Sequence, residues 1–497
     1  MPSTVVGAGS AVGRLRSTLR AHPVATVFVI ALVLRWALSA GFSAFIGGAV
    51  FMDDGLYVQL ATDVATSQTG HWDEYTRWLY HATATYTYLL TALFWLVTPS
   101  MFLGQLITGM FGAVTAALVV RLGMEAMPRK YGFLAGLAIA VLPSQVLWSS
   151  LTLKDAVTWS LLASLAMGIA VTMRTSGRRL AVVGAGLLLP LAGLYFVRAH
   201  IALVALWAMA ITAWLAPAAG RWQRVAATAI AVLVLPWSVG MGPLGIDFVR
   251  AQNDPEDQRA LMAQGADTAF VVPELNLDDD VRRQLREAGE RLREREEALA
   301  AARAAGDADT SEDVADAERD AAQARQDVQA LQDRYLPPEV GRDQLEQWLA
   351  QEAPAESAEP RPTLDEWLST GDDERGEGLL ANLRHLPRGL TVMLLEPLPW
   401  RSTGNRSVDL ARVDMLLWYP MLALAVVGAV TLRGRRLRVL AFPLVVGGGI
   451  ATMHALIQGN LGTAFRHRGE FVWAVALLAA AGVCRLVLAR HGDAPTS

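Results

Sequence analysis

Long apolar blocks recur along most of this chain and constrain its fold more than any other feature. Each block has about 17 to 25 residues, the length that an α-helix needs to cross about 30 Å of hydrocarbon. Of the 497 residues, 53% are hydrophobic and 18% are charged. The sequence therefore predicts a mainly α, polytopic membrane helix bundle of about ten spans, at 23–48, 101–122, 131–148, 156–173, 180–197, 200–217, 225–246, 412–432, 439–458 and 470–488.

Net charge and cysteine content bear on two questions, whether the chain binds nucleic acid and whether it forms disulfides. A net charge of −4 argues against a nucleic-acid partner. The single cysteine, Cys484, lies in the last apolar block, so no intrachain disulfide is expected. The first apolar block is long and is not followed by a small-residue cleavage site, which is typical of a retained helix rather than a cleaved signal.

The distribution of basic residues predicts the topology. Segment 84–98 is apolar, but its 15 residues reach about 22 Å as a helix, which is short for a span. If it is an interfacial or re-entrant helix, five basic groups fall on one side, as the positive-inside rule requires. Both termini are then cytoplasmic in the plasma membrane. The basic groups are Arg14, Arg16 and Arg20; Arg121, Arg129 and Lys130; Arg174, Arg178 and Arg179; Arg221 and Arg224; and Arg433, Arg435, Arg436 and Arg438.

A polar insertion, 247–410, separates an N-terminal transmembrane module, 1–246, from C-terminal transmembrane helices, 411–497. By parity the insertion is extracytoplasmic. Two apolar seams with alternating four- and three-residue spacing predict an antiparallel helical hairpin over about 278–335. The hairpin could hold an acceptor or a partner protein, or could simply pack on the outer face. A flexible linker is expected at 353–363 and a membrane-surface segment at 386–400.

Candidate functional groups gather in the predicted outer segments. Asp53 and Asp54 follow the first span, where carboxylates can deprotonate a hydroxyl or bind a metal, although acids are also common in solvated loops. Lys154 and Asp155 lie at the mouth between the third and fourth spans. The lysine could pair with a lipid phosphate, or both residues could form a local ion pair where Asp155 suits a helix N-terminus.

Several basic side chains lie on the predicted outer side, although the positive-inside rule concentrates such residues on the cytoplasmic side. Their position therefore needs an explanation. Bidentate binding of phosphate is one reason, and contact with anionic lipid head groups is the other. Arg35 lies within the first block, where an ionisable group is a functional candidate unless it snorkels. His454, inside the ninth block, is interpreted as a packing residue rather than a ligand. The basic outer residues are Arg198 and His200, and Arg466, His467 and Arg468.

Taken together, these residues resemble the GT-C fold glycosyltransferases, in particular the protein O-mannosyltransferase and aminoarabinose-transferase branch. The resemblance covers about 1–200 and, more weakly, 412–490. Asp53, Asp54 and Tyr57 are similar to an Asp-Glu pair and a Tyr in the family's first outer loop, with aspartate in place of glutamate. Further matches are Tyr80-His81 before 84–98, Pro143, Ser149, Ser150 and Asp155 in the second loop, and the Arg466-His467-Arg468 triplet.

The resemblance implies an inverting enzyme that moves a sugar from a polyprenyl-phosphate donor to an extracytoplasmic glycan, lipid or protein acceptor. Asp53 would be the general base, with Asp54 supporting it. The substrate-binding residues would be Tyr57, Lys154, Asp155, Arg198, Arg466 and Arg468. Some members of the family use a divalent metal and others do not, so the resemblance does not decide whether this chain binds one. The alternatives are a lipid-linked glycan polymerase or ligase, a transporter or flippase, and a non-catalytic envelope assembly protein.

Overall fold

The computed structural model describes residues 21–47, 49–72, 74–175, 177–215, 224–225, 228–232, 279–305, 311–335, 386–398, 400, 406–456 and 461–490. Within these ranges every regular element is a helix, which confirms the predicted mainly α class. Contacts divide the chain into two compact units, one made of 1–269 and 364–497 and the other of 270–363. The predicted linker at 353–363 lies outside the described residues.

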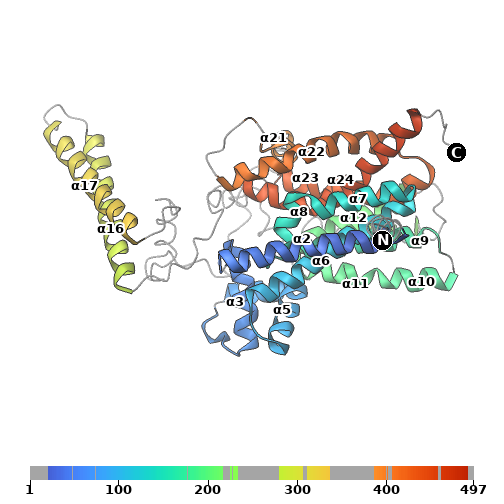
Figure 1. Ribbon diagram of the computed structural model, residues 1–497, viewed down its shortest axis with the longest axis horizontal. Coiled ribbons are helices and arrows are strands. Elements are labelled where there is room, and N and C mark those ends of the chain that lie inside the picture. Colours follow the sequence, from blue (N-terminus) through green and yellow to red (C-terminus); the bar gives the residue numbers. More distant parts are fainter. Residues whose placement is uncertain are drawn as a thin grey trace, which may run out of the picture. The chain divides into compact units, whose positions relative to one another are not determined.

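The first unit contains a bundle of apolar helices, several of them long, with a group of mostly short helices beside it (Figure 1). The bundle helices are α2 (Pro23–Phe45), α6 (Met101–Ala126), α7 (Arg129–Val141), α8 (Pro143–Ser149), α9 (Asp155–Thr172), α10 (Gly177–Gly186), α11 (Leu188–Tyr195), α12 (Ala199–Leu215), α22 (Arg406–Val430), α23 (Gly434–Leu456) and α24 (Leu461–Arg490). The shorter helices are α3 (Met52–Ala65), the 3₁₀ turn η1 (Thr69–His71), α4 (Glu74–Ala82), α5 (Ala84–Leu96) and α21 (Leu386–Leu395).

Among the described residues, seven helices are long and apolar enough to cross a membrane, or eight if one bent pair is counted as a span. A multi-pass membrane protein is therefore supported, but the predicted count of about ten spans is not reproduced. Helix α12 is apolar but has 17 residues, and most of the predicted span 225–246 lies outside the described residues. Helix α5 has 13 residues, in keeping with a segment too short to span.

The predicted third span, 131–148, is not one straight helix. Helices α7 and α8 meet at a bend of 58°. Pro143 has no amide hydrogen and disfavours the helical conformation of the residue before it, and Leu142 is accordingly extended, with ψ of 122°. The break leaves carbonyl groups near the end of α7 without helical partners, and in a membrane such groups need another donor.

Arg35 on α2 supplies those donors. Its side chain is fully buried, and its guanidinium donates to the carbonyl oxygens of Ala140 and Ile139, each at 3.2 Å. The Nε donates to the Ser149 hydroxyl on α8 at 2.7 Å. The guanidinium therefore holds the broken span together. Of the two interpretations of Arg35, snorkelling to the surface does not fit this burial.

Glycine lets two helices of the bundle cross closely. Gly428 on α22 faces α24, and a Cβ at this position would overlap the carbonyl oxygen of Leu478. Gly482 on α24 faces α22 in the same way, where a Cβ would overlap the carbonyl oxygen of Leu424. Small residues at such crossings allow the backbones to approach, which is how membrane helices commonly associate.

We expect the substitution Gly428→Ala to lower the free energy of unfolding by about 1–3 kcal/mol, because the added methyl group must push α22 and α24 apart. Gly448→Ala is a matched control, since no atom lies within 4 Å of a Cβ added there in α23. The control should be neutral or slightly stabilising, because alanine favours a helix. Unfolding in mixed micelles measures both, and equal stability of the two variants would contradict the close crossing.

At one end of the bundle, arginines from three of the predicted cytoplasmic basic groups surround a buried carboxylate. Glu125 near the end of α6 forms ion pairs with Arg121 and Arg174, and its Oε2 lies 3.5 Å from Arg435. The three arginines come from three different basic groups of the sequence. Their meeting at one carboxylate puts these groups on a common side, as the charge bias predicts.

The second unit contains helices α16 (Asp279–Ala305) and α17 (Ser311–Tyr335), close to the two predicted helices. Arg295 pairs with Asp320 at 3.0 Å, and Arg303 pairs with Glu318 at 2.7 Å. Because the partner number falls as the α16 number rises, the helices are antiparallel. Their shared seam buries Ala288, Leu292, Leu299, Ala321 and Val328.

Candidate functional site

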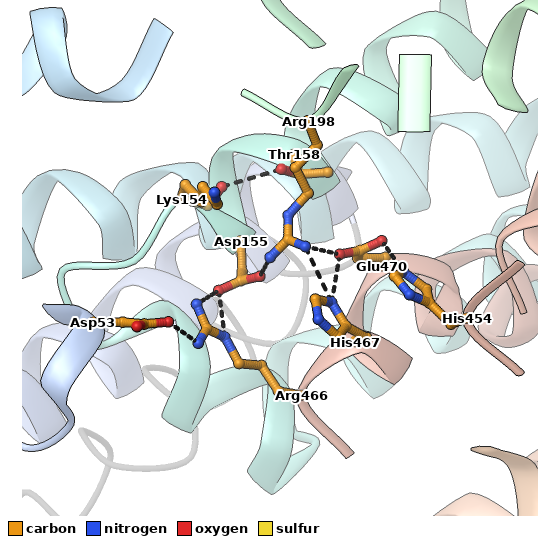
Figure 2. Close-up of polar contacts among 9 residues, drawn as sticks. All are labelled: Asp53, Lys154, Asp155, Thr158, Arg198, His454, Arg466, His467 and Glu470. Carbon is orange, nitrogen blue, oxygen red and sulfur yellow. Dashed lines mark hydrogen bonds and ion pairs between the residues drawn. The ribbon is translucent and has the colours of Figure 1, made fainter. Parts of the chain in front are cut away.

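Five segments that are far apart in the sequence bring polar and charged side chains together at the end of the bundle that holds the start of α9. Figure 2 shows how most of these side chains are linked by hydrogen bonds and ion pairs. They come from the start of α3, the start of α9, the turn between α11 and α12, the end of α23, and the first turns of α24. The cluster residues are Asp53, Lys154, Asp155, Arg198, His454, Arg466, His467 and Glu470.

Asp155 is the centre of the cluster. Its side chain is fully buried, and its two oxygens accept from two different guanidinium groups. Arg198 donates to Oδ1 at 2.6 Å, and Arg466 donates to Oδ2 at 2.9 Å (Figure 2). Asp155 is the first residue of α9, where a carboxylate also interacts favourably with the helix dipole. One buried acid therefore fixes two arginines from distant segments.

Glu470 is a second buried acid, on the other side of Arg198. Its Oε1 lies 3.1 Å from Arg198 Nη1 and 3.0 Å from His467 Nδ1. Its Oε2 lies 2.9 Å from His454 Nε2 on α23. The Glu470 side chain has no exposed surface, so these partners compensate for the loss of its hydration. Arg198 thus lies between Asp155 and Glu470 and joins α9 to α24.

Asp53 is the most accessible acid of the cluster. Its side chain is 48% exposed, and it forms an ion pair with Arg466, which also binds Asp155. The positive charge of Arg466 lowers the pKa of Asp53 below its ordinary value, and Lys154 contributes in the same direction. In this arrangement Asp53 is an ionised carboxylate, exposed on one side and tied to a cation on the other.

Lys154 and Tyr57 form the edge of the cluster next to Asp53. The Lys154 ammonium lies 5.6 Å from the centre of the Tyr57 ring, within the range of a cation–π contact. Burial lowers the pKa of Lys154 to about 7, and the nearby Arg198 cation adds to this effect. Burial also raises the pKa of Tyr57, whose phenol therefore stays neutral. Lys154 can consequently gain or lose its charge near neutral pH.

Asp54 does not join the cluster. Its carboxylate accepts from the backbone amides of Val50 and Phe51, at 3.2 and 3.0 Å, and so caps the start of α3. Burial raises the pKa of Asp54 to about 6. Adjacent helical residues point about 100° apart, so the pair Asp53 and Asp54 cannot both face the same neighbours. The arrangement gives Asp54 a structural task at the helix start.

Arg468 also points away from the cluster. Its guanidinium donates to the carbonyl oxygens of Met393, at 2.8 Å, and of Glu396, at the C-terminal end of α21. Trp418 and Tyr419 of α22 bind neighbouring carbonyls of the same helix end, those of Leu394 and Leu395. Arg468 therefore anchors α21, where a cation is favourable at the negative end of the helix dipole.

Of the predicted site residues, Asp53, Tyr57, Lys154, Asp155, Arg198 and Arg466 come together, whereas Asp54 and Arg468 do not. The sequence interpretation did not single out Glu470. A signal was present, because Arg466 and Glu470 are four residues apart, the spacing that puts two side chains on one helix face. That signal requires α24 to begin before residue 466, whereas the span was expected to begin at 470.

The geometry suits two kinds of chemistry. A half-exposed carboxylate beside fixed cations can accept a proton while a neighbouring anion gains charge. In addition, His454, His467 and Glu470 offer ligand atoms that all lie within 4.8 Å of one another, a set that could hold a metal ion.

The chain was also compared with known proteins. No family model, no curated protein and no solved structure matches it.

Proposed function

We propose that the protein transfers a sugar from a polyprenyl-phosphate donor to a hydroxyl acceptor on the extracytoplasmic side. The observation that carries the proposal is the pairing of the half-exposed Asp53 with Arg466, which is held in turn by the buried Asp155. This arrangement supplies a base and a fixed cation side by side. The resemblance of the outer segments to GT-C fold transferases gives the same reaction class.

The charges of the cluster fit the course of such a transfer. The acceptor oxygen forms a bond to the anomeric carbon while the bond from that carbon to the phosphate oxygen breaks, and the electron pair stays on the phosphate. Asp53 takes the acceptor proton and loses its negative charge as the leaving lipid phosphate gains a second one. Arg466 thus loses the negative charge of Asp53 and gains that of the phosphate as its counterion. Its positive charge is therefore available where the new negative charge develops.

The same pairing couples donor binding to the strength of the base. In the free protein Arg466 lowers the pKa of Asp53, which makes the carboxylate a weak proton acceptor. A donor phosphate that draws Arg466 toward itself weakens this ion pair, and the pKa of Asp53 then rises toward its ordinary value. Asp53 would therefore become a better base once the donor is bound.

Exposure separates the cations into two roles. The Arg466 side chain is 17% exposed and Lys154 is partly exposed, so both can reach a phosphate at the cluster edge. The Arg198 side chain is 6% exposed and is engaged by Asp155 and Glu470, which suits a positioning residue. We assign phosphate contact to Lys154 and Arg466, and no such contact to Arg468.

Incubation of the purified protein in nanodiscs with a panel of radiolabelled polyprenyl-phosphate sugars tests the proposal. Slow release of free sugar, or transfer of label to a crude envelope extract, is the expected result. Absence of both binding and turnover for every donor would overturn it. A polymerase or ligase would instead depend on arginines of the large loop, 247–410, so arginine-to-glutamine variants there serve as the discriminating comparison.

Donor affinity should fall as the pH rises above 7. Lys154, whose pKa burial lowers to about 7, loses its proton in this range, and a donor phosphate prefers the charged form. Binding then requires proton uptake, so the donor Kd should rise by up to about tenfold per pH unit between about pH 7 and 9. Lys154→Arg should remove this dependence, because arginine stays charged. A pH-independent wild type would rule out contact between Lys154 and the phosphate.

A further inference from the structure

Two histidines and a glutamate form a compact group on the side of the cluster where α23 and α24 meet. His467 and Glu470 are three residues apart on α24, so both lie on the helix face that meets α23. His454, near the end of α23, completes the group. The three ligand atoms lie within 4.8 Å of one another, and the residues are buried or nearly so (Figure 2).

His467 Nδ1 lies close to both a donor and an acceptor. Its Nδ1 lies 3.1 Å from Arg198 Nη1 and 3.0 Å from Glu470 Oε1. A guanidinium can only donate and an ionised carboxylate can only accept, so Nδ1 cannot serve both neighbours at once. When Nδ1 accepts from Arg198, its lone pair also lies 3.0 Å from the carboxylate oxygen, so two electron-rich atoms face each other. A metal ion between Nδ1 and the carboxylate accepts electrons from both.

The two imidazole rings also lie side by side. The His454 and His467 rings are stacked, with centroids 4.3 Å apart and an interplanar angle of 16°. Both rings border the Glu470 carboxylate, so two nitrogen atoms and one carboxylate oxygen face the same small volume.

We propose that His454, His467 and Glu470 form a site for a divalent transition metal that links α23 to α24. Two imidazole nitrogens and one carboxylate are a ligand set typical of Zn²⁺ or non-haem Fe²⁺, and they leave a position open for water or another ligand. Mg²⁺ and Ca²⁺ prefer oxygen ligands, so they do not fit. Arg198, which touches both Glu470 and His467, becomes the outer partner that orients the carboxylate.

The proposal does not depend on sugar transfer, and metal content tests it directly. The full chain without a histidine tag is stripped with a chelator in nanodiscs, given one equivalent of Zn²⁺, and desalted. The wild type should retain about one Zn²⁺ per chain, the stoichiometry of a single three-ligand site. His454→Gln and Glu470→Gln should bind Zn²⁺ at least about 10–100-fold more weakly, the loss seen even for outer-shell partners.

His200→Gln is the matched control. The His200 ring contacts the His454 ring edge-on at 6.2 Å, but His200 is not one of the three ligands. This variant should keep the wild-type metal content. Equal retention by all the variants, or a wild type that holds no Zn²⁺, would overturn the site.

A second measurement covers the case in which a variant does not fold. X-ray absorption of the Zn²⁺-loaded wild type should show two imidazole ligands at about 2.0–2.1 Å. A first coordination sphere without imidazole would overturn the assignment regardless of any variant. Addition of Mg²⁺ in excess should leave the spectrum unchanged, since a hard cation does not compete for imidazole nitrogen.

Discussion

If the protein carries out the proposed sugar transfer, replacing Asp53 with asparagine is expected to lower its turnover by about 10²–10⁴-fold, the contribution usually made by a general base. The change is nearly isosteric, and it removes the proton acceptor. Arg466 keeps its second partner, Asp155, so the cation should stay in place. Donor affinity should rise modestly, because the phosphate no longer competes with Asp53 for Arg466, so the loss should appear in kcat and not as weaker donor binding. Single-turnover transfer with saturating donor, together with equilibrium donor binding, separates the two.

Asp63→Asn on the same helix provides the control for Asp53→Asn. Asp63 accepts from Trp72 Nε1 at 2.8 Å, a bond that an asparagine oxygen can still accept, and it lies 3.3 Å from His71 Nε2, which is not a residue of the cluster. This variant should turn over at close to the wild-type rate. If Asp53→Asn keeps more than about a tenth of the wild-type kcat, Asp53 is not the base, because that loss is smaller than proton transfer normally contributes.

Asp155→Asn should lower the free energy of unfolding by about 3–5 kcal/mol, the cost of leaving buried charge without its partner. Asp155 is fully buried and binds both Arg198 and Arg466. Without its negative charge the two guanidinium groups face each other across a neutral amide. Equilibrium unfolding in mixed micelles, followed by tryptophan fluorescence, measures the change.

Asp53→Asn is the control for Asp155→Asn, and its free energy of unfolding is measured in the same way. Asp53 binds Arg466 as well, but its side chain is 48% exposed, and pairs at such sites contribute about 0–1 kcal/mol. The two variants should thus differ strongly in stability although both remove one carboxylate charge next to Arg466. Similar stabilities would mean that Asp155 is better hydrated than its burial indicates.

The sequence alone predicts the broad fold and much of the candidate site. Helix length and hydropathy depend on local composition, so they identify most of the spans. Of the five basic groups, three meet at Glu125. The predicted outer groups Asp53, Lys154, Asp155, Arg198 and Arg466 gather for the same reason, since parity places the ends of their segments together.

What the sequence does not supply is the direction of each side chain. Asp54 and Arg468 neighbour true members of the cluster, yet each serves a nearby helix end. The choice depends on where a helix begins, and α24 begins nine residues before the start expected from hydropathy alone, at 461 instead of 470. Polar residues in the first turns of a membrane helix lower its hydropathy, which hides the true boundary. The pairing of Glu470 with Arg198 depends on contacts between distant segments, which no local pattern contains.

Arg35 has a consequence for the biogenesis of the protein. The carbonyl groups that accept hydrogen bonds from its guanidinium belong to Ile139 and Ala140. The ribosome adds Ile139 only 104 residues after Arg35. At about 5–20 residues per second, the nascent first helix waits roughly 5 to 20 s for them. Until then an unpaired cation in hydrocarbon costs at least about 2.5–3.5 kcal/mol, so lateral release of this helix from the insertion machinery should be delayed until the third span arrives.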